Sequence, residues 1–171
     1  TIAVNISAVQ FRHKSLEDTV NRALAYSNLP PQWLELELTE GLIMEGSDAI
    51  IGIMQRLRQI GVKLSIDDFG TGYSSLSYLK RFPIDKLKID QSFVREMLAE
   101  QASLAIVESI ISLAHSLGKE TIAEGVETQA ELDVLTERGC RLMQGYYFSK
   151  PLPVLNFEAW VRARNGVEFI S

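Results

Sequence analysis

The chain has 171 residues and a formal charge of −5, with 17 Lys and Arg against 22 Asp and Glu, and 46% of its residues are apolar. These values are typical of one globular domain and exclude a disordered chain. A single cysteine and two histidines argue against a disulfide framework and a Cys/His zinc site, so any metal ion would need oxygen ligands. The acidic balance argues, at face value, against DNA, RNA or another polyphosphate as a partner. No apolar run approaches the about 18 residues of a membrane span, so we expect a cytoplasmic domain that meets a membrane only through other parts of a larger protein.

Six short β-rich runs alternate along the chain with stretches that have the apolar spacing of helices. We expect strands at Ile2–Ser7, Leu34–Thr39, Val62–Asp67, Lys86–Asp90, Glu120–Ala123 and Arg141–Tyr146. Helices are predicted to begin after Ser15 and Ser47 and to end at Gly61, Gly118 and Gly139. This alternation predicts an α/β fold with a mostly parallel sheet.

Two architectures fit the alternation: an open doubly wound sheet and a closed eight-stranded (β/α) barrel. A barrel normally needs roughly 250 residues, whereas this chain supplies six strand and helix units in 171 residues. Either the sheet is open, or the chain is a barrel that lacks its first part.

Polar residues interrupt the predicted strands, mainly where the strands end. The residues at or just beyond these carboxyl ends are Asn5, Glu37, Asp67, Asp68, Lys88, Asp90 and Glu124. Functional sites of parallel α/β proteins are built at this end. Any one acid is explained as well by an exposed strand end or a helix cap, as for Asp68. The same feature on five strands favours a site.

Carboxylates gathered at one mouth would repel one another unless they were neutralised. Oxygen ligands select hard divalent cations such as Mg²⁺ or Mn²⁺, and the adjacent Asp67 and Asp68 could serve two of them. A pair of such ions suits phosphodiester hydrolysis. Gly70 and Gly72 follow directly, and we interpret them as a mobile loop that covers or uncovers the ions.

Six short motifs occur along the chain in a fixed order. They are Asn5-Ile-Ser7, Glu37-Leu-Thr-Glu40, Asp67-Asp-Phe-Gly-Thr-Gly-Tyr-Ser-Ser75, Lys88-Ile-Asp90, Ala123-Glu-Gly-Val-Glu127 and Gln144-Gly-Tyr146. In order and spacing they resemble the motif series of the EAL domain family, from Asn5 to about Pro153. The resemblance implies a TIM-like (β/α) barrel that hydrolyses cyclic di-GMP to linear pGpG with two Mg²⁺ or Mn²⁺ ions, in bacterial second-messenger signalling.

The resemblance also implies a role for individual residues. One ion would be held by Asn5, Glu37 and Asp67, and a second by Asp67, Asp68 and Glu124. Lys88 would position the attacking water, and Glu124 would be the general base. Glu40 would support the loop of Gly70 and Gly72, whereas Asp90, Glu127 and Gln144 would line the site wall. Of the basic residues Lys80, Arg81, Lys86 and Lys88, we expect only Lys88 to face the site.

The Glu-Ala-Leu triplet that names the family should lie upstream of Asn5, where this chain has four residues. We therefore expect residues 1–171 to be the C-terminal two-thirds of a single EAL-type barrel domain, N-terminally truncated to about six βα units. Open strand edges would then favour a homodimer, and this piece alone would have little or no activity. The intact domain is expected to be an active phosphodiesterase. The alternative is a catalytically silent cyclic di-GMP-binding receptor.

A phosphoacceptor receiver domain also combines acids and a lysine on an α/β sheet. That class has no use for the motifs Ala123-Glu-Gly-Val-Glu127 and Gln144-Gly-Tyr146, so it is disfavoured.

Overall fold

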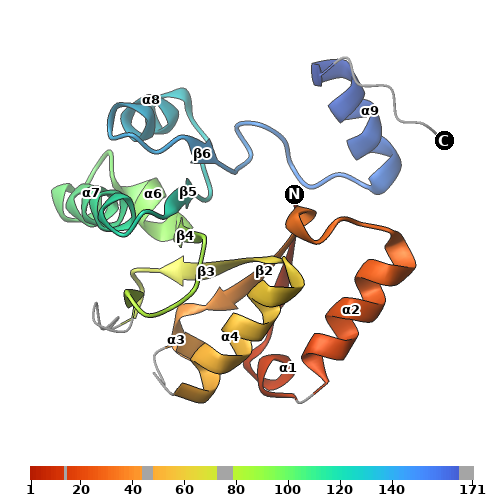
Figure 1. Cartoon of the computed structure of the whole chain (residues 1–171). Helices are drawn as coiled ribbons and strands as arrows, with labels where there is room; N and C mark the ends of the chain where they lie inside the picture. The colour runs from red at the N-terminus through yellow and green to blue at the C-terminus, as the bar shows by residue number, and fades with distance from the viewer. Residues whose placement is uncertain (14, 44–47, 73–78, 166–171) are drawn as a thin grey trace.

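The computed structural model describes residues 1–13, 15–43, 48–72 and 79–165. Its centre is a sheet of six parallel strands whose spatial order, β1-β2-β3-β4-β5-β6, follows the order along the chain (Figure 1). The strands are β1 (Ile2–Ile6), β2 (Leu34–Thr39), β3 (Lys63–Phe69), β4 (Lys86–Ile89), β5 (Glu120–Ala123) and β6 (Leu142–Met143). A doubly wound sheet reverses its strand order at a switch point. The described strands contain no such reversal, so the sheet is wound in one direction, as in a barrel.

The strand bounds agree with the predictions most closely for β2 and β5. The largest difference is at β6, which has two residues where a strand was predicted over Arg141–Tyr146. Beyond β6 the chain still pairs with its neighbour: the Gln144 N–H donates to the Ala123 carbonyl at 2.9 Å and the Val126 N–H donates to the Gln144 carbonyl at 3.1 Å. This segment therefore continues along the end of β5 and the loop that follows it.

Helices follow most of the strands. They are α1 (Ala8–Arg12), α2 (Leu16–Ser27), the short 3₁₀ helix η1 (Pro31–Trp33), α3 (Glu40–Ile43), α4 (Asp48–Ile60), α6 (Gln91–Glu96), α7 (Gln101–Ser116), α8 (Gln129–Glu137) and α9 (Val154–Asn165). None of the helices in the described ranges combines the length and hydropathy needed to cross a bilayer.

The predicted helix ends are confirmed at the glycines. Gly61, Gly118 and Gly139 have φ values of +101°, +65° and +86°, which a residue without a Cβ adopts at little cost. Ser15 lies at the expected N-cap position of α2, but its side chain makes no capping hydrogen bond there; its Oγ lies 2.7 Å from His13 Nδ1 instead. The predicted cap at Ser47 lies outside the described residues.

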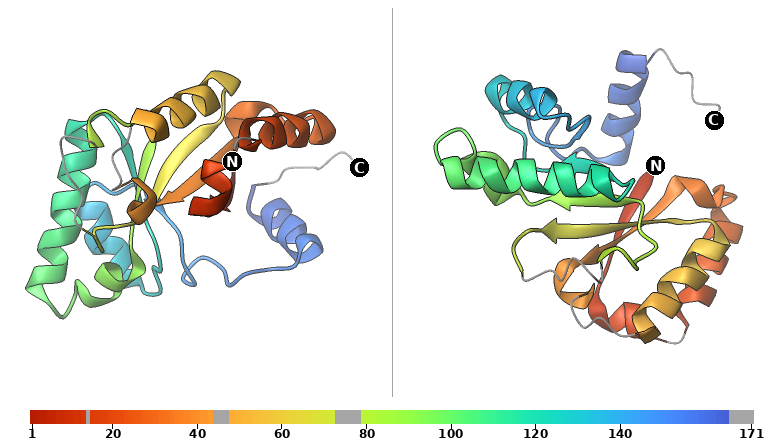
Figure 2. Two further views of the ribbon diagram at one scale, coloured as in Figure 1. Left: turned by 90° about the horizontal axis from the view of Figure 1, so that it is seen from below. Right: turned by 60° about the vertical axis from the view of Figure 1, so that its left-hand side comes forward.

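The sheet has an apolar outer face and a polar inner face. The outer positions of the central strands are buried against the helices: Leu36, Leu38, Leu64, Ile66, Leu87 and Ile89. Figure 2 shows α2, α4 and α7 on this outer side of the curled sheet. Side chains alternate between the two faces of a strand, so the intervening polar residues of Leu-Glu-Leu-Glu-Leu in β2 point inward. This alternation explains why the strands do not read as continuous apolar runs.

Candidate metal and catalytic centre

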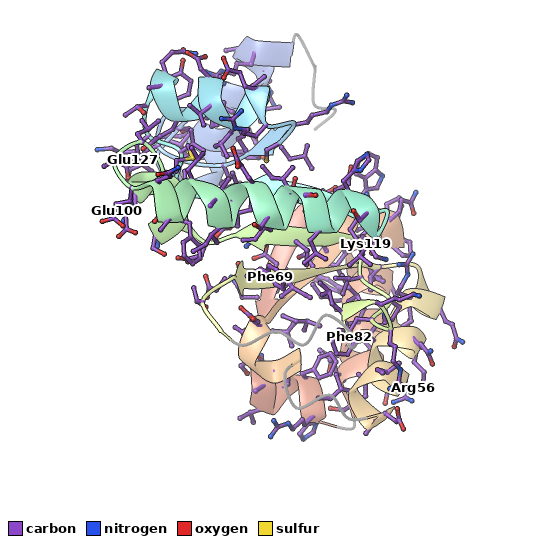
Figure 3. The ribbon with its side chains drawn as sticks, turned by 90° about the vertical axis from the view of Figure 1, so that its left-hand side faces the viewer. Arg56, Phe69, Phe82, Glu100, Lys119 and Glu127 are labelled. Atoms are coloured by element: carbon purple, nitrogen blue, oxygen red, sulfur yellow. The ribbon has the colours of Figure 1, made fainter. Side chains whose placement is uncertain are left out.

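The predicted site residues meet on the inner face, at the carboxyl ends of the strands. Glu37 comes from β2, Asp67 from β3 and Lys88 from β4, whereas Glu124 directly follows β5. Figure 3 places Glu127, which lies beyond β5, towards the left edge of the molecule, and Lys119, which precedes β5, well to the right of it. The parallel arrangement thus brings residues far apart in the sequence to one mouth.

Lys88 is the centre of this cluster. Its Nζ lies 2.8 Å from Glu37 Oε1, 2.8 Å from Asp67 Oδ1 and 2.7 Å from Glu124 Oε1. The lysine side chain is only 5% exposed, and the three carboxylates are between 9% and 17% exposed. Burial acts to lower the pKa of Lys88, but its hydrogen bonds to Asp67, Glu124 and Glu37 outweigh burial and raise the pKa, so the ammonium stays charged.

The carboxylates retain capacity for a cation. Lys88 Nζ contacts one oxygen of each of the three carboxylates. Three negative charges therefore face one positive charge, and the four ionised side chains together carry a net charge of −2. Ligand oxygens of Asp67, Asp68 and Glu124 all lie within 4.8 Å of one another. Opposite ligands of one Mg²⁺ ion are about 4 Å apart, and carboxylate oxygen is the ligand that Mg²⁺ and Mn²⁺ prefer. The donor set and its spacing therefore fit a hard divalent ion.

The backbone at Asp68 explains how two consecutive carboxylates reach the same place. Neighbouring residues of a regular strand point to opposite faces. Asp68, however, has a left-handed backbone with φ of +53°, and the register between β3 and β4 shifts between Ile66 and Phe69. This irregularity turns Asp68 towards Asp67 and Glu124.

Burial raises the pKa of the two carboxyl groups that flank the cluster. For Asp68 burial is the largest cause, and the charges of Asp67 and Asp90 add to it. For Glu124 burial again dominates, partly offset by Lys88. Both shifts arise mainly from burial, and neighbouring negative charges, which a divalent cation would offset, add to them.

Asp90 has a structural partner that sequence reasoning did not predict. It is the N-cap of α6, where its carboxylate accepts hydrogen bonds from the backbone N–H of Ser92 at 2.9 Å and from the Ser92 hydroxyl. Burial acts to raise its pKa, but these hydrogen bonds outweigh burial and lower it. The negative charge of Asp90 also acts to raise the pKa of Asp68, which couples the cap to the cluster electrostatically.

The remaining predicted residues lie around this centre. Asn5 is the register partner of Glu37 on the neighbouring strand β1. Gln144 is exposed, and its backbone pairs with Ala123 and Val126. Glu127 is 43% exposed and pairs with Arg95 at 3.0 Å, so its described ion pair lies outside the group around Lys88.

Glu40 holds the glycine segment that follows β3. Its Oε2 accepts hydrogen bonds from the backbone N–H groups of Gly70 at 3.0 Å and Gly72 at 3.1 Å. The carboxylate is buried, and a Cβ on Gly72 would press against it at 3.2 Å. The part of this motif from Tyr73 to Ser75 lies outside the described residues.

Replacing Glu40 with alanine is expected to lower the free energy of unfolding by about 1.5–3 kcal/mol, the value of hydrogen bonds to a charged group. Both glycine N–H groups would lose their acceptor. Urea denaturation of the full-length natural protein measures the change. Glu17→Ala is the matched control, because Glu17 pairs with Arg56 at the surface and such pairs contribute about 0–1 kcal/mol. Equal losses in the two variants would contradict the anchoring role.

Gly145 is required by a close approach of two backbones. A Cβ at this position would overlap the backbone N and O of Val126, which lies between Glu124 and Glu127. The Tyr147 N–H then donates to the Val126 carbonyl at 3.0 Å. The Gln144-Gly145 segment therefore holds the loop that carries Glu124.

For this reason Gly145→Ala is expected to lower the free energy of unfolding by about 1–3 kcal/mol, as overpacking does. Gly41→Ala serves as its control, because outside the flanking residues and the helix's own backbone no atom of the described residues lies within 4 Å of the Cβ it would add. Chemical denaturation midpoints of the two variants give the comparison. A Gly145→Ala protein as stable as Gly41→Ala would refute the close contact.

Two interactions that support the site were not predicted from the sequence. Glu131, at the start of α8, is buried and accepts hydrogen bonds from the N–H groups of Glu127 at 2.7 Å and Thr128 at 2.8 Å. The signal was present as a capping box, Thr128-x-x-Glu131. The second interaction is an ion pair between Lys86 and Glu35 on the inner face. The alternation of Glu35 with leucines and the spacing of Lys86 from Lys88 indicate that each residue shares a face with a predicted site residue, but not that the two residues meet.

Comparison with known proteins identifies the family to which the chain belongs. The EAL domain family matches residues 1–151. The chain is 48% identical over 162 residues to the cyclic di-GMP phosphodiesterase NbdA of Pseudomonas aeruginosa, covering 95% of this chain and 21% of that protein. It spans about a fifth of the length of the curated relatives that it matches.

Solved structures agree in fold and in identity. The PaMucR phosphodiesterase in complex with c-di-GMP superimposes with a TM-score of 0.89 at 46% identity, over 92% of this chain and 64% of that chain. BlrP1 of Klebsiella pneumoniae, solved in calcium and manganese complexes with cy-diGMP, matches with a TM-score of 0.80 at 37% identity, over 87% of this chain and 38% of that chain. These matches confirm the six units as part of a TIM-like (β/α) barrel. The chain belongs to the EAL domain family.

Proposed function

We propose that the domain containing this chain hydrolyses cyclic di-GMP to linear pGpG with two Mg²⁺ or Mn²⁺ ions. The observation that carries the proposal is the Lys88 ammonium within 2.8 Å of three carboxylates that are at most 17% exposed and come from three different strand ends. The named relatives with cyclic di-GMP activity or bound cyclic di-GMP support the choice of substrate. The proposed partner is this dinucleotide and not a DNA or RNA polymer.

The proposed ligand sets are those that the resemblance to the EAL family implies, and the grouping of Asp67, Asp68 and Glu124 supports the second of them. Asn5, Glu37 and Asp67 would hold one ion, and Asp67, Asp68 and Glu124 would hold the other. Asp67 is shared because it lies between Glu37 on β2 and Glu124 after β5, and its Oδ1 already meets Lys88. Such ions, when bound, generate a nucleophile from water and stabilise charge on the phosphate oxygens.

The other residues act on the water and on the substrate. Lys88 would donate a hydrogen bond that orients the attacking water, and Glu124 would accept the proton that the water loses. Glu40 would keep the Gly70 and Gly72 segment at the mouth. Asp90, Glu127 and Gln144 would line the wall that surrounds the dinucleotide.

The net charge of the site favours this partner once the ions are present. The acids alone would repel a phosphodiester. Two divalent cations would add four positive charges at the mouth, so that the same residues would attract the two phosphates of the substrate.

The test is hydrolysis by the full-length natural protein. Cyclic di-GMP is incubated with Mg²⁺ or Mn²⁺, and the nucleotides are separated by anion-exchange chromatography, with EDTA as the control. The proposal predicts metal-dependent appearance of pGpG. Tight binding of cyclic di-GMP without turnover would instead identify a silent receptor and refute the proposed activity.

A further inference from the structure

A second ion pair lies in the interior of the curled sheet, one layer deeper than Lys88. Lys86 Nζ donates to both carboxylate oxygens of Glu35, at 3.1 Å and 2.8 Å. The side chains of Lys86 and Glu35 are 13% and 4% exposed, so the pair is largely shielded from water. Neither residue belongs to the motifs that define the proposed site.

This pair joins two strands that are not neighbours. β2 and β4 flank β3, so the contact between Glu35 and Lys86 passes over Ser65, the register partner of Lys86. Ser65 is fully buried, and its Oγ is a buried side-chain oxygen without a hydrogen-bond partner among the described residues. A small side chain here leaves room for the ion pair to bridge β3.

The same pattern recurs two residues further along each strand. Glu37 of β2 and Lys88 of β4 meet at 2.8 Å, and Asp67 of β3 lies between them. Side chains two residues apart on a strand point to the same face. The Glu35–Lys86 pair therefore lies directly below Glu37 and Lys88, on the same inner face of the same two strands.

We propose that Glu35 and Lys86 are positioning residues: their ion pair fixes the spacing of β2 and β4 and thereby holds Glu37, a proposed metal ligand, in place beside Lys88 and Asp67. Stability alone does not account for the pair, because well-packed apolar residues serve a buried position at least as well. Two charge-assisted hydrogen bonds to one carboxylate instead restrict geometry. The inference rests on the proposed function, because it assigns residues to that same site.

The test separates positioning from stability in the full-length natural protein. Lys86→Met and Glu35→Leu each leave a buried charge without its partner, so each single variant is expected to lower the thermal midpoint. The double variant Glu35→Leu/Lys86→Met removes both charges and is expected to recover that midpoint. Ser65→Ala is the matched control within the same layer, because its Oγ has no partner to lose among the described residues.

The deciding measurement is the dissociation constant for Mn²⁺, from the electron paramagnetic resonance signal of free Mn²⁺. The double variant is expected to bind Mn²⁺ about tenfold or more weakly, as when supporting partners of metal ligands are removed, and Ser65→Ala is expected to bind as the wild type does. Glu35→Gln, which can still accept from Lys86, is expected to fall between the wild type and the double variant.

A double variant that binds Mn²⁺ as tightly as the wild type does would overturn the positioning role, whatever the affinity of Glu35→Gln. The readout does not depend on catalysis. A wild-type protein that binds Mn²⁺ but does not hydrolyse cyclic di-GMP would refute the proposed function, while the comparison of Mn²⁺ affinities would still decide this inference.

Discussion

Lys88→Met is expected to lower the free energy of unfolding of the metal-free protein by about 3–5 kcal/mol, the cost of removing one partner from a buried ionic group. Lys88 is the cation that three carboxylates share at 2.7–2.8 Å. Without it, Glu37, Asp67 and Glu124 would face one another with no positive charge between them. Urea denaturation in the presence of EDTA measures the loss.

Lys80→Met is the control for this change, because Lys80 is exposed. It is expected to alter stability by no more than about 0.5 kcal/mol, as surface substitutions usually do. If Lys88→Met were as stable as Lys80→Met, the three carboxylates would not depend on the ammonium, and the electrostatic account of the mouth would be wrong.

Glu124→Gln is expected to reduce kcat for cyclic di-GMP hydrolysis by at least about 10²-fold, the lower range for loss of a general base. Glutamine has nearly the same shape but cannot accept the proton from water, and it offers a weaker ligand to a divalent ion. The fold should persist, because Lys88 keeps Glu37 and Asp67 as partners. Steady-state kinetics in Mg²⁺ or Mn²⁺ measure the change.

Glu108→Gln provides the matched comparison for Glu124→Gln. Glu108 is 44% exposed and pairs with Arg138 at 2.6 Å on the surface, so its loss should leave kcat near that of the wild type. A Glu124→Gln enzyme with wild-type kcat would remove Glu124 from the proposed mechanism.

The positions of most strands and helix ends along the chain could be predicted from the sequence because local patterns determine them. The alternation in Leu34–Thr39 defined β2 to the residue, and the acids after each strand pointed to the correct end of the sheet. The glycines at Gly61, Gly118 and Gly139 marked helix ends through their own backbone requirement. These features depend on residues close together in the chain.

Features that depend on contacts across the sheet were not predicted. Lys86 was expected to lie away from the site among other basic residues, but it points inward and meets Glu35, 51 positions earlier in the chain. The left-handed backbone at Asp68 and the overlap that Gly145 avoids at Val126 are also set by tertiary packing. A single sequence carries no information on the register that creates these contacts.

The position of the metal ions can be measured in crystals of the full-length natural protein grown with Mn²⁺, from an anomalous difference map recorded near the manganese edge. The account predicts two peaks at the mouth, one beside Asn5, Glu37 and Asp67 and one beside Asp67, Asp68 and Glu124. A map with no manganese at these carboxylates, or with manganese only at other residues of the domain, would contradict it.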